Sequence, residues 1–558
     1  RRVRGNCVAS ETGEDDSSNL CIQSILSTSV PRFLLLWSWI VFLPNWPRGC
    51  WPTGPRQFNL QIAVTCERIG LLIYSGANVN TETGEFKDSM VVCQSSQGVE
   101  MRGTLIRLTR YLAVFEVYTP AIVLRASEVL EDLKIVVQDR IVYSGRAVVS
   151  NLVNAGSVAV CEAKLDETKF DVASFLPAET KGRIADGFSE FLAYWQKIYR
   201  VQQEFKVIMA DMQTFLTDLR QWLEQVELGI RSTPTGDRVK LEHDIAEQLR
   251  PSVVGAINNL FERFETVASH VDADLVPAHQ AFGKRQLLPL LLSSPFVYRT
   301  YQKPLGYAGD YEMINMMFRD GAEGGSLFAK MINLYALQLL PIVGHRNRIE
   351  LLHQRLVEEA RRSAAARKTL RVFNMGCGPA HELQKFLTSD PLSNNASFTL
   401  VDFNEETLAH TGGVLNDLKN RHSRRTAIQM QKKSVHQILK QADRVIQQPA
   451  GEGYDMVVCA GLFDYLSDKV CRKLLEIFHD MLAPGGVLIA TNVDDHPARN
   501  EMEYFLEWHL IHRNTEQLRA LAPYRSTPEN ISLMRDATGV NIFMEVRKNG
   551  ETNPVSKR

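Results

Sequence analysis

Residues 371–380 read Arg-Val-Phe-Asn-Met-Gly-Cys-Gly-Pro-Ala, and this stretch decides the fold of the C-terminal part of the chain. A short apolar run leads into a turn at which Gly376 and Gly378 let the backbone approach a ligand without a Cβ in the way. Pro379 suits the first turn of a helix, whose free N–H groups point toward the same ligand. The stretch therefore predicts a strand, a ligand-binding turn and a helix, in that order.

A second apolar run, residues 398–401, ends in Asp402, about two dozen residues after the glycine turn. Nucleotide-binding α/β units place at this position the acid that binds the hydroxyl groups of a ribose. Further runs that read as strands are 369–374, 427–431, 454–459, 487–491, 531–534 and 541–546. Together these runs predict a mostly parallel, Rossmann-like sheet of seven strands, of which the last two form a hairpin.

The composition describes an ordinary globular protein of several domains. The chain has 558 residues, of which 45% are hydrophobic and 23% are charged. Lys and Arg number 63 against 64 Asp and Glu, so the net charge does not favour nucleic acid as a partner. The nine cysteines form no C-x-x-C pair and no Cys/His cluster at ligand spacing. We therefore expect a cytoplasmic protein with reduced thiols, no metal site and no nucleic-acid partner.

The first 56 residues differ from the rest of the chain. The sequence opens with Arg, and the apolar run 33–43 ends at Pro44. This run is shorter than the roughly 20 residues that a membrane-spanning helix needs. A small-residue cleavage site does not follow it, as it would in a signal peptide. We expect residues 1–56 to be a disordered leader, without stable insertion into a membrane.

Residues 57–165 carry short β-branched or alternating runs, which predict a small β-barrel or sandwich. The runs are 59–64, 90–93, 104–108, 112–117, 133–137 and 158–161, with two more between residues 140 and 153 around Ser144-Gly145. This part resembles a PilZ domain, the barrel with which many bacterial proteins sense cyclic di-GMP. The arginine pair and the Asn/Asp-x-Ser-x-x-Gly signature of that family are missing. We therefore expect a structural or docking role for the barrel.

Residues 178–345 are helical by their hydrophobic period. Apolar side chains recur every seven positions at Phe191, Ile198, Phe205, Met212, Leu219 and Val226, and a second amphipathic stretch covers 239–268. The pattern favours a helical bundle within the chain, and a homodimer through this region is the alternative. Residues 298–312, with four tyrosines, two glycines and a proline, predict an ordered loop against a ligand. Tyr307 and Asp310 are the candidate contacts in this loop, and a packing loop between domains is the alternative.

The order of these motifs resembles that of class I S-adenosylmethionine-dependent methyltransferases over residues 368–548. The glycine turn, the acid after the second strand, Tyr454-Asp455 on the fourth strand and Pro484-Gly-Gly before the fifth occur in sequence. More narrowly, Lys303-Pro-Leu-Gly-Tyr-Ala-Gly-Asp-Tyr-Glu and Gly344-His-Arg-Asn-Arg-Ile are similar to bacterial extracellular-factor, 3-hydroxypalmitic acid methyl ester biosynthesis proteins. That family makes the methyl ester of a 3-hydroxy fatty acid as a quorum-sensing signal. The resemblance implies a helical domain and substrate lid over 178–345 and a methyltransferase domain over 346–550.

The resemblance also implies which residues bind S-adenosylmethionine. The cofactor-binding candidates are Asn374, Gly376, Cys377, Gly378, Asp402, Phe403, Ser434, Val435, Gly461, Leu462, Phe463 and Asp310. The candidates at the site of methyl transfer are Tyr307, Asp464, Tyr465 and Arg346. One position departs from the family: Asn374 stands where many of these enzymes have an acid. An amide accepts a hydrogen bond from the cofactor's ammonium group but brings no charge, so we expect Asp310 or Asp464 to supply that charge.

The acceptor is inferred from the chemistry of the transfer. A carboxylate with a pKa of about 4–5 is ionised at neutral pH and needs no general base, only a cation to orient it and an apolar surface for its tail. We expect a helix over 501–512 to provide that surface, with Arg499, Arg513 or Arg346 as orienting groups and surface or capping roles for His496, His509 and His512. The prediction is O-methylation of a small lipophilic carboxylic acid, such as a 3-hydroxy fatty acid. The alternatives are a ligand-sensing signalling protein with a degenerate methyltransferase fold and an N-methyltransferase of a small amine.

Overall fold

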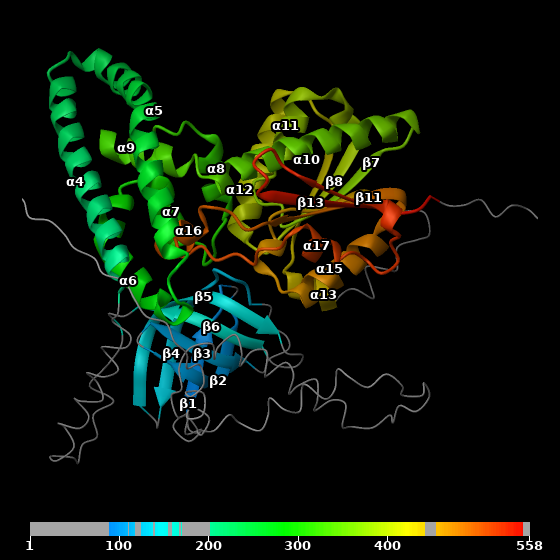
Figure 1. Cartoon of the computed structure of the whole chain (residues 1–558). Coiled ribbons are helices and arrows are strands. Elements are labelled where there is room, and N and C mark those ends of the chain that lie inside the picture. Colours follow the sequence, from blue (N-terminus) through cyan, green and yellow to red (C-terminus); the bar gives the residue numbers. More distant parts are fainter. Residues whose placement is uncertain are drawn as a thin grey trace, which may run out of the picture. The chain divides into compact units, whose positions relative to one another are not determined.

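The computed structural model describes residues 89–96, 98–109, 111–117, 124–137, 140–154, 159–166, 169, 201–440 and 453–550. The predicted leader, the strand expected at 59–64 and the helical positions Phe191 and Ile198 lie outside these residues. Residues 70–558 form one compact unit. Within it, a barrel, a group of helices and an α/β domain follow one another along the chain (Figure 1).

The N-terminal part is a closed barrel, as the short alternating runs predicted. Its strands are β1 (Ser89–Gln94), β2 (Glu100–Leu108), β3 (Leu112–Val117), β4 (Val129–Val137), β5 (Arg140–Asn154) and β6 (Ala159–Leu165), in the order β1-β2-β3-β6-β5-β4. Buried and exposed residues alternate along β1 and β2, because side chains of a strand point alternately to its two faces. Phe115 and Tyr143 fill the interior. The two runs expected around Ser144-Gly145 are one long strand, whose pairing with β4 shifts register between Leu130 and Leu133.

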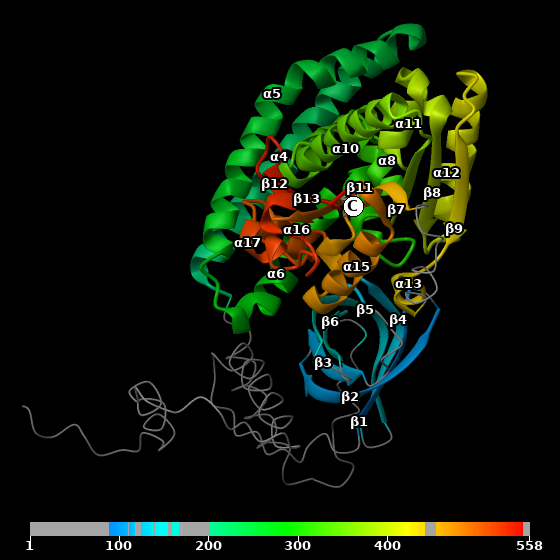
Figure 2. The same cartoon turned by 90° about the vertical axis from the view of Figure 1, so that its right-hand side faces the viewer.

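The middle of the chain is helical. Its elements are α4 (Gln203–Arg231), α5 (Thr235–Ala268), η3 (Ala273–Leu275), α6 (Val276–Leu291), α7 (Pro295–Gln302), α8 (Tyr311–Phe318) and α9 (Leu327–Ala336). α4 and α5 lie side by side (Figures 1 and 2), and the predicted seam of α4 is buried in a core shared with α5 and α9. A dimer through this region stays a prediction. The predicted loop 298–312 is shorter than expected, because α7, capped by the Ser294 side chain, continues to Gln302.

The C-terminal part is a doubly wound α/β domain with the predicted seven strands. These are β7 (Leu370–Met375), β8 (Ala396–Asp402), β9 (Ala427–Lys432), β10 (Tyr454–Cys459), β11 (Leu482–Val493), β12 (Ile531–Arg535) and β13 (Asn541–Arg547). The order is β12-β13-β11-β10-β7-β8-β9, with parallel pairing from β11 to β9 and antiparallel pairing of β13 with β11 and β12. β7 lies between β10 and β8, so the chain reverses direction across the sheet at β7. Ligands of open α/β sheets bind at such a reversal, outside the carboxyl ends of the strands.

Helices cover both faces of this sheet (Figure 2). The helical elements of this part of the chain are α10 (Leu340–Ala365), α11 (His381–Ser389), η4 (Pro391–Asn395), α12 (Glu405–Arg421), α13 (Val435–Lys440), η5 (Phe463–Tyr465), α15 (Asp468–Asp480), α16 (Arg499–Phe505), α17 (Thr515–Arg519) and η6 (Pro528–Asn530). Of these, α16 packs against α5 and α6 instead of the sheet. Val372 packs with α10, α11 and α12, whereas its neighbour Phe373 packs with α13 and α15 on the other face. The near-continuous burial of β7 follows from this double cover.

One helix prediction was wrong at its end. The helix expected over 501–512 is the short α16, which ends at Phe505 because Glu507 takes a left-handed conformation with φ of 49°. The helix predicted after the glycine turn, near Pro379, begins at His381, since Ala380 before it is left-handed, with φ of 52°. Among the described residues, no single helix combines the length and apolar character for crossing a membrane, and the bent pair α9 and α10 does so only when both are counted together.

Candidate active site

The glycine turn and the predicted acid meet at the carboxyl edge of the sheet. Gly376 and Gly378 have φ of 69° and 50°, a region that glycine adopts without the cost of a Cβ. The Gly376 amide donates to the Val401 carbonyl at 2.8 Å, which ties the turn to β8. The Gly378 amide donates to Oδ2 of Asp402 at 3.3 Å, and the Asn404 amide donates to Oδ1 at 3.0 Å. The acid therefore lies on the same side of the sheet as the turn.

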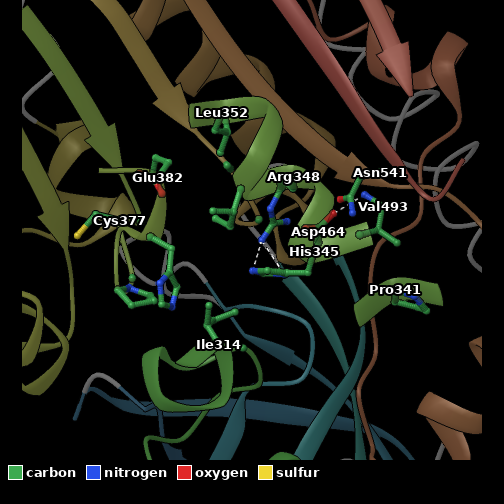
Figure 3. Close-up of a pocket in the computed structure, with 18 of the residues that line it drawn as sticks. Ile314, Pro341, His345, Arg348, Leu352, Cys377, Glu382, Asp464, Val493 and Asn541 are labelled. Carbon is green, nitrogen blue, oxygen red and sulfur yellow. Dashed lines mark hydrogen bonds between the residues drawn. The ribbon is translucent and has the colours of Figure 1, made fainter. Parts of the chain in front are cut away.

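A cavity of about 110 Å³ lies at this edge (Figure 3). The glycine turn forms one side of it, the segment after β10 a second, and α10 a third. Apolar side chains from α8, α10, α16 and the segment after α16 complete the lining: Ile314, Ile349, Leu352, Met502, Trp508 and Leu510. The predicted helix at 501–512 was thus wrong in its extent, but the same segment does contribute apolar surface.

A smaller cavity of about 20 Å³ lies behind the glycine turn. Its lining residues are Arg125, Met375, Gly376, Asp402, Phe403, Val435 and Leu462. Gly376 lines both cavities, so the turn separates a mainly apolar compartment beside Asp402 from the larger one. This is the arrangement that a nucleoside with a further polar group requires: an apolar place for a base, a carboxylate for the ribose, and bare backbone between.

Glu382 brings a carboxyl group to the larger cavity. The Asn374 side chain donates from Nδ2 to Glu382 Oε1 at 2.8 Å, and both side chains are buried. Burial raises the pKa of Glu382 to about 7, although its own backbone N–H, Arg348 and Asn374 oppose the rise. Glu382 thus places a carboxyl group directly beside Asn374, whereas we had expected Asp310 or Asp464 to supply the charge for the ammonium group. The sequence showed Glu382 only as a first-turn acid that complements the dipole of α11.

Arg348, on α10, is a buried cation that lines the larger cavity. One of its terminal nitrogens, Nη2, lies 2.9 Å from the His345 ring, and its Nε has no hydrogen-bond partner among the described residues. Asp464 and Glu382 are its nearest sources of negative charge, and Figure 3 shows Arg348 between them. A Cβ added at Gly461 would lie 2.6 Å from Arg348 Nη2, so a glycine is required there. The guanidinium thus keeps an unused donor on a residue that lines the cavity.

Arg346, two residues away from Arg348, was one of the candidate orienting groups, with Tyr307, Arg499 and Arg513. Positions two apart on a helix lie on opposite sides of it. The Arg346 guanidinium donates to the carbonyl oxygens of Met317 and Leu337 at 3.1 and 2.8 Å, and Arg346 does not line either cavity. The stretch Gly344-His-Arg-Asn-Arg-Ile contains the cavity residue Arg348. Its position on the helix, opposite to that of Arg346, places it at the cavity.

The other predicted residues divide into those that line a cavity and those that do not. Asn374, Gly376, Cys377, Gly378, Gly461, Asp464 and Tyr465 line the larger cavity, and Gly376, Asp402, Phe403, Val435 and Leu462 line the smaller. Asp310 instead caps α8 and pairs with Arg299 at 2.9 Å. The Tyr307 ring packs against Phe403, with centroids 5.0 Å apart. Phe463 is buried in the core under α15, and Ser434 accepts a hydrogen bond from the Gln437 amide in the first turn of α13.

Two of the lining residues have partners that limit their chemistry. Asp464 Oδ1 accepts a hydrogen bond from the Val493 amide at 2.6 Å, which fixes the carboxyl group. The Tyr465 hydroxyl accepts a hydrogen bond from Nε1 of Trp508 at 3.0 Å. Burial and the neighbouring Asp464 raise the pKa of Tyr465 far above neutrality, so this phenol stays protonated. Burial lowers the pKa of His381 to about 4 and that of His345 well below its usual value, so both imidazoles are neutral at pH 7.

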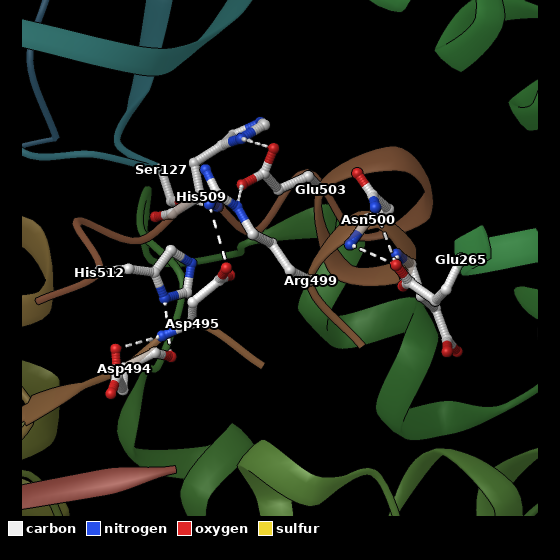
Figure 4. Close-up of polar contacts among 10 residues, drawn as sticks. Ser127, Glu265, Asp494, Asp495, Arg499, Asn500, Glu503, His509 and His512 are labelled. Carbon is white, nitrogen blue, oxygen red and sulfur yellow. Dashed lines mark hydrogen bonds and ion pairs between the residues drawn. The ribbon is translucent and has the colours of Figure 1, made fainter. Parts of the chain in front are cut away.

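Arg499, His509 and His512 lie in a polar cluster outside both cavities (Figure 4). Arg499 pairs with Glu503 at 2.8 Å and with Asp495 at 3.4 Å. His512 contacts the Asp494 carbonyl through Nδ1 at 3.1 Å. Arg513 is buried and bonded to Asp468 and to backbone carbonyls, so its donors are used within the fold. His496 is buried beside His512, with ring centroids 5.4 Å apart.

A family model described as a methyltransferase domain matches residues 373–488. The chain is also similar to solved structures. One is described as an exported protein from Bordetella parapertussis, with 16% identity, TM-score 0.36, and coverage of 55% of this chain and 97% of that one. Another is magnesium protoporphyrin IX methyltransferase from Synechocystis with bound S-adenosylhomocysteine, with 12% identity, TM-score 0.30, and coverage of 45% and 98%. A third is the N-methyltransferase NodS from Bradyrhizobium japonicum, with 17% identity, TM-score 0.25, and coverage of 45% and 98%.

No curated protein matches the chain. The matched family model covers the glycine turn, Asp402 and the segment after β10. The strand order and the geometry of the turn agree with it. Residues 373–488 thus match a methyltransferase domain.

Proposed function

We propose that this chain is a cytoplasmic methyltransferase that esterifies the carboxylate of a small lipophilic acid, such as a 3-hydroxy fatty acid. The observation that supports this acceptor is Arg348, a buried guanidinium with an unused Nε–H in a largely apolar cavity. The resemblance of residues 303–312 and 344–349 to biosynthesis proteins of a fatty acid methyl ester signal supports the same acceptor.

The residues present fit S-adenosylmethionine. Asp402 would bind the ribose hydroxyls, and the backbone at Gly376 and Gly378 leaves room for the methionine part of the cofactor. Phe403 and Leu462 would enclose the adenine, and Glu382 would bind the ammonium group. When bound, the cofactor supplies an electrophilic methyl group: a new C–O bond forms while the C–S bond breaks, and the electron pair goes to sulfur.

The protein's own groups favour an acceptor that is already anionic. A carboxylate needs no general base, since it is ionised at neutral pH. The lining Tyr465 stays protonated, and the pKa values of His345 and His381 are depressed, so none of the three is a strong base at pH 7. Arg348 would orient the carboxylate through a charge-assisted hydrogen bond, while Met502, Trp508 and Leu510 would contact the tail.

The test incubates the purified full chain with labelled S-adenosylmethionine and a 3-hydroxy fatty acid, or with an amine that carries the same tail. We expect a methyl ester by mass spectrometry and, at saturating S-adenosylmethionine, a rate that stays flat as pH rises above about 6, because the acceptor is already ionised. A methylated amine with a rate that rises toward pH 9 would contradict the proposed acceptor. Absence of product from either compound, with no binding of S-adenosylhomocysteine, would favour a ligand-sensing role instead.

Arg348→Met keeps an unbranched apolar stem and removes the guanidinium with its charge. We expect kcat/KM for the acid to fall about tenfold to hundredfold, since a hydrogen bond to a charged group contributes about 1.5–3 kcal/mol. Affinity for S-adenosylhomocysteine should stay within about twofold. Arg361→Met, at an exposed position on the same helix, is the matched control and should leave both quantities unchanged. Equal loss in both variants would contradict the role of Arg348.

A further inference from the structure

A segment of the barrel, residues 124–129, contacts three parts of the chain that surround the candidate active site. The Ala126 amide donates to the Tyr465 carbonyl at 3.3 Å, just after β10. The Ser127 hydroxyl donates to the His509 carbonyl at 2.9 Å, in the segment after α16. The Val129 amide donates to the Gly306 carbonyl at 2.8 Å, in the loop between α7 and α8. The barrel is therefore in direct contact with the walls of the site.

Arg125, in this segment, reaches the smaller cavity itself. The central carbon of its guanidinium lies 4.2 Å from the centroid of the Phe403 ring and 5.1 Å from that of Tyr307. It lines the cavity together with Asp402 and Val435. A side chain from the barrel thus lies where the adenine end of the cofactor would bind. No motif in the sequence indicates Arg125 as a ligand contact, because Arg125 is remote in sequence from every motif of the methyltransferase domain.

Arg125 is held by a buried network within the barrel. Its side chain is 7% exposed, and that of Glu128 is 0% exposed. Glu128 accepts hydrogen bonds from the Arg125 amide at 3.0 Å and from the Ser96 hydroxyl at 2.7 Å, and Arg125 Nη2 donates to the Ser96 oxygen at 2.9 Å. The Nε of Arg125 has no hydrogen-bond partner among the described residues. That Nε lies 3.7 Å from Glu128 Oε2 in an ion pair, so the barrel positions the guanidinium, whose carbon lies 4.2 Å from the centroid of the Phe403 ring.

We propose that Arg125 is a cofactor-binding residue, through which the barrel completes the adenine subsite of the methyltransferase domain. A guanidinium stacks on aromatic faces and donates in its plane, and a purine offers both a π-face and ring nitrogens that accept. The cavity, about 20 Å³, has room for little more than a water molecule. The guanidinium must therefore slide along the Phe403 ring as the nucleoside enters. Because Glu128 already neutralises the charge of Arg125, this subsite suits a neutral base rather than an anion.

The experiment measures binding of S-adenosylhomocysteine by titration calorimetry on the full chain. We expect Arg125→Ala to weaken binding about tenfold, the scale of a desolvated cation–π contact, and Arg125→Lys to recover part of the loss. Arg102→Ala, in β2 with a side chain 71% exposed, is the matched control on the same barrel and should bind as the wild type does. Unchanged or tighter binding in Arg125→Ala would overturn the proposal, and tighter binding would mean that the arginine blocks the subsite.

A second probe separates a contact at the adenine from a general effect on the site. Methylthioadenosine carries the adenosine but lacks the amino acid part, so Arg125→Ala should weaken it by the same factor as S-adenosylhomocysteine. Glu382→Gln should weaken S-adenosylhomocysteine alone. Loss of only S-adenosylhomocysteine in Arg125→Ala would also overturn the proposal.

Two further binding measurements, on Ser96→Ala and on the wild type, cover the case in which Arg125→Ala does not fold and the case in which the cofactor does not bind. Should Arg125→Ala fail to fold, Ser96→Ala keeps the arginine and removes one hydrogen bond that positions it. We expect it to weaken binding about threefold, and an unchanged affinity would overturn the proposal. The inference rests on the proposed cofactor. If the wild type does not bind S-adenosylhomocysteine, the proposed function and the role of Arg125 are both contradicted. Equal binding by the wild type and Arg125→Ala contradicts only the role of Arg125.

Discussion

The two ends of the candidate site each contain a buried arginine, but the surroundings of the two arginines differ. Arg125 lies against the fully buried Glu128 and stacks on Phe403. Arg348 contacts a neutral histidine, and no ion pair within 4.0 Å involves it among the described residues. The end near Phe403 therefore suits a neutral purine, and the end near Arg348 suits a ligand that brings its own negative charge. Buried arginines elsewhere, such as Arg513, have used their donors within the fold.

The largest effect is expected from Gly461→Ala, which disturbs only the Arg348 end. The new Cβ would lie 2.6 Å from Arg348 Nη2, and φ at this position is +77°, so the guanidinium must move and the backbone is strained. We expect kcat/KM for the acid to fall about hundredfold, comparable to the loss of the charged contact itself. Steady-state kinetics with the labelled cofactor measures this loss. Gly539→Ala, with φ of +75° and open space around it, is the control for backbone strain and should keep its activity.

The next effect is expected at the opposite end, from Asp402→Asn. The carboxylate accepts amides of Gly378 and Asn404, and an amide in its place accepts through one oxygen only. We expect affinity for S-adenosylhomocysteine to fall about tenfold or more, because hydrogen bonds to a charged group are lost. Titration calorimetry measures the affinity, and thermal unfolding without ligand checks the fold. An unchanged affinity would show that the ribose is not bound at Asp402.

The smallest effect is expected from pH, through Glu382. Its pKa in the folded protein is about 7, above the usual value of 4.5, because burial disfavours the charged form. Its contribution to stability is therefore fully present below pH 4.5 and is lost as pH rises through 7. Binding of an ammonium group favours the ionised form, so affinity for S-adenosylhomocysteine should rise about threefold to tenfold between pH 6 and 8. Glu382→Gln should remove this dependence, and its persistence would assign the titration to another group.

Much of the α/β domain could be predicted from local patterns. The seven strands, the glycine turn and Asp402 were predicted because strand periodicity, positive-φ glycines and an acid at a strand end are properties of neighbouring residues. The closed barrel followed from the same alternation. The ends of helices were less predictable: left-handed backbone at Ala380 and Glu507 carries no clear signal, since neither residue favours that region.

The partners of the site residues could not be predicted in the same way. Arg346 and Arg348 occur in one short motif, and only the packing of α10 determines which of them faces the cavity. Asp310 has the composition of a ligand contact, but its neighbour Arg299 and the start of α8 use its oxygens. Glu382 lies in the first turn of α11, where an acid stabilises the helix dipole, so the sequence did not indicate its contact with Asn374.

The sequence by itself determined the order of strands and helices, the glycine turn and the acid that follows the second strand, because short-range periodicity and backbone preferences fix these features. Only the tertiary structure decided which charged groups remain available to a ligand. That depends on which donors and acceptors are already paired, and such pairing joins residues as distant as Arg125 and Phe403. Burial makes the distinction energetically important, since an unpaired charge in a low-dielectric interior costs far more than one in water.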